Sequence, residues 1–332
     1  MHRGKVWLLG AAIALAGLAV QACGGSAPAN DAKPREPRIA VIPKGTTHEF
    51  WKSIHAGAVK ASREDGAFVI WKGPVREDDR DEQIKVMETF LSQQVDGIVI
   101  APLDSKALVP VLNDARARKI PVAIIDSAVE WDGAVTFVAT DNVKAGGLAA
   151  ERLGTVLGGK GRVMMMRLQE GSASTTERET GFLATLAAKF PGIKVVSSNQ
   201  YGGATTETGF ATAERLLASY RDVEGVFCPN ETTTFGMLLA LDAAGRAGKV
   251  KFVGFDASPK LVEALEQGKI DGLVLQNPLR MGELGVRLLL SAIRGEKVEQ
   301  RVDTGATMVT RENMTQPEIR ALILPDLSKY LN

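Results

Sequence analysis

The feature that most constrains the fold is an alternation of short apolar runs with longer segments of helical periodicity. The runs are continuously apolar, which is typical of strands that are buried on both faces of a parallel sheet. Segments between them, such as "DEQIKVMETFLSQQ" and "TGFATAERLLASY", carry apolar residues at helical spacing, so the pattern predicts βαβ units. The runs are "RIAVI", "AFVIW", "DGIVIA", "PVAIID", "VTFVAT", "GRVMMM", "IKVVSS", "GVFCP", "KFVGFD", "DGLVLQ" and "TMVT".

Two stretches of the chain repeat one plan. Asp96–Ala128 contains "DGIVIAPLDS…KIPVAIIDSA", and Glu224–Ser258 contains "EGVFCPNETT…KVKFVGFDAS". Each has an acid–glycine opening, an apolar strand, a proline, a helix, a second strand, and then an aspartate followed by small residues. The runs are also too many for one sheet in a chain of 332 residues. We therefore predict an α/β fold with two Rossmann-like lobes, each built on a parallel sheet.

Ligands of open parallel sheets bind beyond the carboxyl ends of the strands. Asn230 and Asp256 can equally serve as caps of the helices that follow them. The uncharged amide of Gln276 suits hydrogen bonding to a neutral ligand. The candidate residues at strand ends are Lys44, Asp104, Asp126, Asn230, Asp256 and Gln276.

The stretch "THEFWKSIHAG" places Phe50 and Trp51 side by side where a helix is expected to begin, with Thr46 or Thr47 as its cap. Adjacent residues of a helix do not share a face, so we expect one ring in the apolar stripe and the other at the strand-end cleft. That second ring either covers a loop or serves as a flat platform for a ligand. Arg178, near the start of another helix, is either solvated or aimed into the cleft.

The N-terminus has the pattern of an export signal. Two basic residues precede the apolar run "VWLLGAAIALAGLAV", and "LAVQAC" resembles a bacterial lipobox. We expect residues 1–22 to be removed and Cys23 to be lipidated, with residues 23–37 as a flexible tether. The alternative is ordinary signal cleavage with a spare cysteine. The other cysteine, Cys228, is expected to be a buried small hydrophobe.

Composition and missing motifs exclude several classes of function. The formal charge is +1, from 40 basic and 39 acidic residues, so a nucleic-acid surface is not indicated. The sequence has no G-x-G-x-x-G, P-loop or G-x-S-x-G motif. The histidines His2, His48 and His55 have no cysteine near them in a metal-ligand pattern, and they give no support for a Ser–His–Asp triad. We expect a protein that is not an enzyme, with no metal and no cofactor.

The quoted segments resemble, in the same order along the chain, the signatures of type I periplasmic binding proteins of the ribose/galactose kind, which serve ABC sugar importers. They are "RIAVIPKGTTHEFWKSIHAGAVKAS", "KIPVAIIDSA", "TTERETGF", "GVFCPNETTTFGMLLAL", "KFVGFDASP" and "DGLVLQNP". The resemblance extends from about Arg38 to Met314. It implies a set of ligand-binding residues: His48, Phe50, Trp51, Asp126, Ser127, Arg178, Asn230, Phe255, Asp256 and Gln276.

Two departures from the ribose type make ribose itself doubtful as the ligand. Ser127 stands where the ribose type has an arginine, and Tyr201 is only the nearest match to its stacking aromatic. A monosaccharide or a sugar-like polyol is the class of ligand that the resemblance implies. Lys44 and His48 could favour an acidic or modified sugar.

The resemblance also implies three crossings between the lobes, near Thr140, Asn277 and Gly305, with lobe closure by hinge motion. We expect an exported monomer, in the periplasm or at the cell surface, that is anchored by its lipid and delivers a sugar to an ABC permease. The alternative is a receptor subunit of the same fold that presents its ligand to a membrane sensor. The expected lobes are 38–140 with 277–305 and 141–276 with 306–332.

Overall fold

The computed structural model describes residues 35–331, and within them the chain forms two six-stranded sheets. The predicted signal (1–22), Cys23 and most of the tether lie outside the described residues. None of the described helices is long and apolar enough to cross a membrane.

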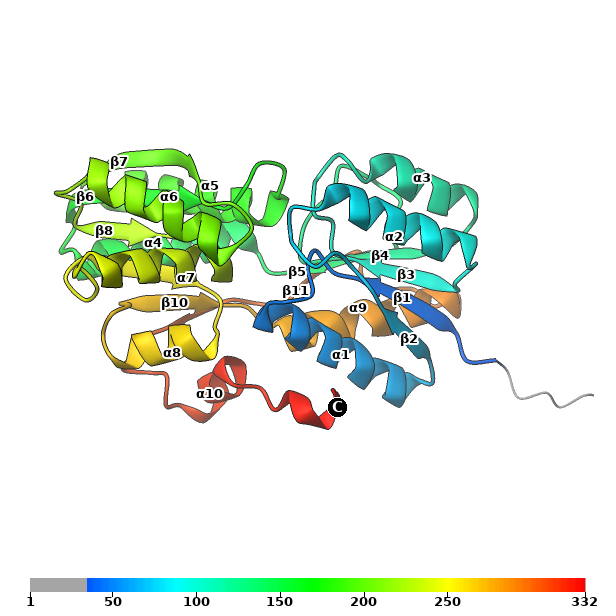
Figure 1. Cartoon of the computed structure of the whole chain (residues 1–332). Helices are drawn as coiled ribbons and strands as arrows, with labels where there is room; N and C mark the ends of the chain where they lie inside the picture. The colour runs from blue at the N-terminus through cyan, green and yellow to red at the C-terminus, as the bar shows by residue number, and fades with distance from the viewer. Residues whose placement is uncertain (1–34, 332) are drawn as a thin grey trace, which may run out of the picture. The chain divides into compact units, whose positions relative to one another are not determined.

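The first sheet has the strand order β11-β5-β4-β3-β1-β2, and every pair of neighbours is parallel. The first lobe is this sheet with four helices, and Figure 1 shows α2 and α3 on one side of the strands and α1 and α9 on the other. Its strands are β1 (Arg38–Ile42), β2 (Phe68–Trp71), β3 (Gly97–Ile100), β4 (Val122–Ile125), β5 (Thr136–Ala139) and β11 (Arg301–Asp303). Its helices are α1 (Glu49–Asp65), α2 (Arg80–Ser92), α3 (Val109–Ala117) and α9 (Pro278–Ile293).

The second sheet has the order β12-β10-β9-β8-β6-β7, and only its edge strand β12 runs antiparallel to its neighbour. The second lobe is this sheet with the remaining helices. Its strands are β6 (Lys160–Arg167), β7 (Gly192–Tyr201), β8 (Gly225–Phe227), β9 (Lys251–Phe255), β10 (Gly272–Leu275) and β12 (Thr307–Val309). Its helices are α4 (Asn142–Val156), α5 (Ala173–Lys189), α6 (Thr206–Ser219), α7 (Glu231–Ala243), α8 (Pro259–Glu266) and α10 (Pro317–Ile323), followed by the 3₁₀ turn η1 (Leu327–Lys329).

Successive residues of one strand pack into different cores, which explains why the runs are continuously apolar. On β1, Ile39 and Val41 pack against α1 and α9, whereas Ala40 and Ile42 pack against α2 and α3. In the second sheet, the two faces of β6 likewise contribute Met165 to one core and Met164 to the other. The prediction of two Rossmann-like lobes is therefore confirmed. β11 was missed because it is short and partly exposed.

The chain passes between the two sheets three times within residues 35–331: between β5 and α4, between β10 and α9, and between β11 and β12. The Thr140 hydroxyl joins all three passages, since it lies 3.0 Å from Gln276 Oε1 and 3.3 Å from the carbonyl oxygen of Gly305. The carboxyl ends of the strands of both sheets therefore face one region between the lobes, where side chains of both line the same cavity.

Candidate functional site

Asp126 and Asp256 occupy matched positions in the two lobes. Each directly follows a buried strand, and each adopts a left-handed backbone, with φ of 63° and 64°. Each also donates its backbone N–H to the strand beside it, to Val138 at 3.0 Å and to Val274 at 2.9 Å. Aspartate is one of the few non-glycine residues that tolerate this conformation. The internal repeat seen in the sequence thus delivers two carboxylates to the site by the same backbone geometry.

The carboxylate of Asp126 is paired with a buried lysine. Lys44, just beyond β1, brings its Nζ to 2.8 Å from Asp126 Oδ2, and both side chains are 4% exposed. The same ammonium donates to Ser174 Oγ at 3.0 Å, at the start of α5 in the second lobe. Ser127 contributes indirectly, since its Oγ accepts the backbone N–H of Ser174 at 3.1 Å. Lys44 therefore neutralises the aspartate of its own lobe and also contacts the other lobe.

Both aromatic rings at the start of α1 are buried, so the expectation that only one joins the core was wrong. Phe50 is 8% and Trp51 2% exposed, and they pack edge to face with centroids 4.9 Å apart. Both rings belong to the core between α1 and the sheet, and both also line the cavity at the strand ends. The helix cap is also different from the expectation, because His48 and not a threonine occupies the N-cap position.

Glu77, on the loop after β2, holds Trp51 and His48. Its Oε1 accepts the indole N–H of Trp51 and lies 3.2 Å from His48 Nδ1. Burial alone would lower the pKa of His48, but the bond to Glu77 and the neighbouring carboxylates raise it to about 9. Burial opposes ionisation of Glu77, yet His48, Lys44 and Trp51 hold its pKa below the usual value. Glu77 and His48 therefore form a charged pair that fixes the orientation of the indole.

Arg178 is buried and aimed at the site, which decides between the two alternatives left open by the sequence. It lies inside α5 and is 2% exposed. Its Nε donates to Asn142 Oδ1 at 2.8 Å, and one terminal nitrogen donates to the carbonyl of Pro229 at 2.9 Å. The guanidinium lies over the ring of Phe255, with 4.2 Å between its carbon and the ring centroid. Phe255 thus supports the arginine from below.

Asn230 and Glu231 stand together where β8 leads into α7. Asn230 caps the helix, since its Oδ1 accepts the N–H of Thr233 at 3.2 Å, and it also lines the cavity. Glu231 Oε2 lies 3.5 Å from the backbone N–H of Phe50, at the start of α1 in the first lobe. Burial raises the pKa of Glu231 to about 7, against the opposing charge of His48. This carboxyl group faces the site with no cation bonded to it among the described residues.

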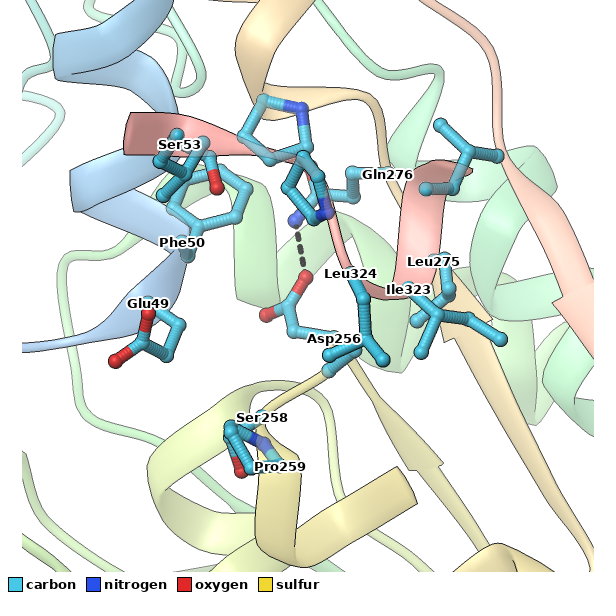
Figure 2. Close-up of a pocket in the computed structure, with 15 residues that line it drawn as sticks. Glu49, Phe50, Ser53, Asp256, Ser258, Pro259, Leu275, Gln276, Ile323 and Leu324 are labelled. Atoms are coloured by element: carbon cyan, nitrogen blue, oxygen red, sulfur yellow. Dashed lines mark hydrogen bonds between the residues drawn. The ribbon is translucent and has the colours of Figure 1, made fainter. Parts of the chain in front are cut away.

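Asp256 has a neutral partner. Gln276 Nε2 donates to Asp256 Oδ1 at 2.8 Å, and both residues are buried (Figure 2). Burial raises the pKa of Asp256, and the charge of Arg178 opposes that shift. The alternative role of Asp256 as a helix cap is wrong, because Ser258 holds the N-cap position of α8.

These side chains line one cavity of about 330 Å³, here called the ligand cavity. The structure does not bring Ser127 or Phe255 to its wall; they lie behind Ser174 and Arg178. The predicted residues that it brings together are His48, Phe50, Trp51, Asp126, Arg178, Asn230, Asp256 and Gln276.

Sequence reasoning missed several residues of the wall. Glu77 lies in a charged loop, "VREDDR", without a recognisable motif, and only its position after β2 could have suggested it. Glu231 follows Asn230 directly, but an acid in the first turn of a helix is ordinary and carries no functional signal. Lys44 was considered among the strand ends but was not carried into the predicted set. The others are Leu168, Ser174 and Thr175.

One flank of the ligand cavity is closed by a loop, residues 169–174, which we call the interlobe loop. Gln169 Nε2 donates to the carbonyl of Glu77 at 2.7 Å, and Arg80 donates to the carbonyl of Glu170 at 3.0 Å. Gly171 accepts the N–H of Ser105 at 3.0 Å. With φ of 89°, Gly171 approaches Asp104 so closely that a Cβ would lie 2.2 Å from its Oδ2. Only glycine fits this contact between the lobes.

The site offers binding groups and no catalytic arrangement. Its carboxylates and amides accept and donate hydrogen bonds, Arg178 donates, and Trp51 and Phe50 supply flat apolar surface. Among residues 35–331, no cluster of three histidine, cysteine, aspartate or glutamate side chains is placed to hold a metal ion. Fold and site together define a two-lobed α/β protein with a cavity lined by polar side chains of both lobes.

The comparisons with known proteins identify the family. Residues 39–297 match the model of the periplasmic binding protein domain, and the chain belongs to this family. Its members are exported solute-binding proteins, so membership confirms the prediction of a binding protein and not an enzyme. Membership of this family also agrees with the export signal expected at the N-terminus.

The similar proteins bind sugars. The chain is 32% identical to the D-ribose/D-allose-binding protein of Pseudomonas aeruginosa, over 86% of this chain and 90% of that protein. A carbohydrate transporter solute-binding protein of Agrobacterium radiobacter, solved with D-arabinose, is 35% identical with a TM-score of 0.85, over 88% of this chain and 100% of the other. One from Agrobacterium vitis, bound to α-D-tagatopyranose, is 30% identical with a TM-score of 0.84, over 88% and 100%.

Proposed function

We propose that this protein is the substrate-binding lipoprotein of an ABC sugar importer and that it captures a monosaccharide or sugar-like polyol in the ligand cavity. The observation that carries the proposal is the set of buried polar groups from both lobes around that cavity. Hydroxyls of a sugar both donate and accept, so they suit Asp256, Gln276 and Asn230, while a C–H face suits Trp51. The similarity to proteins that bind ribose, allose, arabinose and tagatose supports the same class of ligand.

The charges around the cavity favour a neutral sugar over a sugar acid. The ammonium of Lys44 is neutralised by Asp126 and fixed by Ser174. Arg178 has Asn142 and Pro229 as partners, and His48 has Glu77. A carboxylate on the ligand would instead meet the carboxyl groups of Asp256 and Glu231. Because both cations have carboxylate partners, this arrangement does not support the hypothesis from the sequence that Lys44 and His48 favour an acidic sugar.

Hinge closure is the mode of capture that we propose. The lobes, with the bounds predicted from the sequence, would close through the three passages that Thr140 joins, and the interlobe loop would complete the closed state. Charge-assisted hydrogen bonds of about 1.5–3 kcal/mol each, less the cost of association, suffice for micromolar or tighter binding. Export, lipidation at Cys23 and delivery to a permease as a monomer complete the proposal.

A thermal-shift screen of neutral sugars, polyols and sugar acids, followed by calorimetry of the hits, tests the proposal. We expect at least one neutral sugar to bind, and Trp51→Ala to weaken it at least about a hundredfold through lost stacking and a reshaped cavity. Trp51→Phe keeps an aromatic ring but loses the bond to Glu77 and part of the ring surface; it is the matched control and should retain more of the affinity than Trp51→Ala. The absence of any response across the panel would overturn the proposal.

Membrane attachment has its own test. Cys23→Ser should release the exported protein from the membrane fraction, and mass spectrometry of the wild-type N-terminus should find an acylated Cys23. A wild-type protein that is released without acylation would show ordinary signal cleavage instead.

A further inference from the structure

A second cavity of about 610 Å³, here called the side chamber, adjoins the ligand cavity. It lies between the first turn of α1, the loop from β9 to α8, the end of β10 and the C-terminal segment. Phe50, Asp256 and Gln276 line both cavities, so the two share a wall made of side chains (Figure 2). A ligand held by Asp256 and Gln276 therefore lies directly beside the side chamber.

The C-terminal segment that covers the side chamber is anchored at both ends. Ile319 and Ile323 of α10 are each 6% exposed and belong to the core of the second lobe. Beyond the chamber, Arg63 of α1 in the first lobe donates to the carbonyls of Lys329 at 2.9 Å and Tyr330 at 3.1 Å. The segment is thus a fixed wall of the chamber and not a loose tail.

The walls of the side chamber are largely apolar. Leu324 lies between the two anchors and is 53% exposed. Leu275, Pro278 and Leu327 extend the apolar lining, while Glu49 and Ser258 add polar groups. The polar side chains of the lining, Glu49, Ser53 and Ser258 with Asp256 and Gln276, come from α1 and the ends of β9 and β10. The C-terminal segment contributes only apolar side chains to the lining, so this wall favours an apolar or aromatic group over a second set of sugar hydroxyls.

The opposite flank of the ligand cavity is covered by the interlobe loop. The interlobe loop closes it through Gln169, Glu170, Gly171 and Ser174, all bonded to the first lobe. At the flank of Phe50, the first turn of α1 meets the second lobe through the long contact of 3.5 Å between the backbone N–H of Phe50 and Glu231 Oε2, and Arg63 contacts the C-terminal segment beyond the side chamber. A substituent on the bound sugar can therefore extend past Phe50 but not past the interlobe loop.

We propose that the side chamber is a second ligand subsite, which receives an apolar group attached to the sugar, so that the preferred ligand is a glycoside with a small apolar aglycone. The inference rests on the proposed function, since it requires a sugar in the ligand cavity. Asp256 and Gln276 hold the hydroxyls on one side of the shared wall, and Leu324 and Pro278 contact the aglycone on the other. Phe50 turns about its side-chain bonds to let the linkage pass.

Calorimetry with matched ligands tests the subsite. Free aldopentoses and aldohexoses are compared with their α- and β-phenyl glycosides. For a sugar that binds, we expect one phenyl anomer to bind at least about tenfold more tightly, because the ring buries apolar surface in the side chamber. Phenyl glycosides that bind no more tightly than the free sugar would overturn the inference and leave the proposed function intact. A failure of every sugar and every glycoside to bind would overturn both.

Variants of Leu324 test whether the tighter binding of the phenyl glycoside comes from contacts in the side chamber. Leu324→Asp should abolish the advantage of the phenyl glycoside, and Leu324→Ala should reduce it, while the free sugar binds as before in both. The matched control is Leu239→Asp, at another exposed leucine, on α7 away from both cavities. It should change neither affinity. An undiminished advantage in Leu324→Asp would place the aglycone elsewhere and overturn the subsite.

Discussion

Asp126 and Asp256 share one backbone geometry but have different partners. Both end a buried strand in the left-handed conformation, and both are at most 7% exposed. Asp126 is paired with the ammonium of Lys44, whereas Asp256 is bonded to the neutral amide of Gln276. The internal repeat thus places the two carboxylates at equivalent positions, but the side chains that contact them differ between the lobes.

This difference separates two roles within one site. A buried carboxylate beside a buried cation is already neutralised, and removing either partner leaves an uncompensated buried charge. A buried carboxylate with only an amide partner keeps an acceptor oxygen for an incoming hydroxyl. We therefore expect Asp126 to act mainly on stability and Asp256 mainly on binding.

The largest expected difference is between the losses of stability when Lys44, the partner of Asp126, or Gln276, the partner of Asp256, is replaced. Lys44→Met leaves the buried carboxylate of Asp126 without a cation, and it should lower the free energy of unfolding by about 3 kcal/mol. Gln276→Leu removes the hydrogen bonds to Asp256 and Thr140 while Arg178 stays nearby, so the expected loss is smaller, about 2 kcal/mol. Urea denaturation of the two variants measures both losses.

A double variant controls this prediction. Lys44→Met combined with Asp126→Asn removes both charges and should recover most of the stability that Lys44→Met loses. Equal losses for Lys44→Met and Gln276→Leu, or no recovery in the double variant, would contradict the contrast between the two aspartates.

The two-lobed fold and the places of both aspartates could be predicted from the sequence, because buried parallel strands leave a continuous apolar pattern and the repeat marks their ends. The partners could not be predicted. Lys44 and Asp126 are distant in the sequence, and nothing in either local pattern records that their side chains meet. The same holds for Glu77, whose loop has no motif but whose carboxylate holds Trp51.

Neutralising each aspartate should separate binding from stability. Asp256→Asn should weaken binding of the identified sugar by at least about tenfold, because a charge-assisted hydrogen bond is lost. Its melting temperature should stay level or rise, since burial disfavours the charged form of Asp256 and raises its pKa. Asp126→Asn should lower the melting temperature instead, because the ammonium of Lys44 loses its partner.

Calorimetry and thermal denaturation of the two variants provide the measurement. An Asp256→Asn protein that loses as much stability as Asp126→Asn, or that binds with unchanged affinity, would show that the two carboxylates play equivalent roles.

The smallest expected effect is a pH dependence of the free energy of unfolding. It comes from Glu231, which lines the ligand cavity in the second lobe together with Asp256. Burial raises its pKa from 4.5 to about 7, so the folded protein holds the proton more firmly than the unfolded chain does. This contribution to stability is complete below about pH 4.5 and is lost as the pH rises through 7. We expect a loss of about 1 kcal/mol between pH 5 and 8, because residual contact with solvent reduces the penalty of the charged form.

Glu231→Gln tests this assignment, because it removes the titrating group and retains the size of the side chain. Its free energy of unfolding should change less between pH 5 and 8 than that of the wild type. Glu214→Gln, at an exposed position on α6, should leave the wild-type pH dependence unchanged. Because His48 faces Glu231 and its pKa is raised from 6.5 to about 9, a further loss of stability should run from about pH 6.5 to pH 9 in every variant, so only the part of the decline that Glu231→Gln removes belongs to Glu231. If the free energy of unfolding of Glu231→Gln falls between pH 5 and 8 as much as that of the wild type, another group causes the fall. The assignment of the raised pKa to Glu231 would then be wrong.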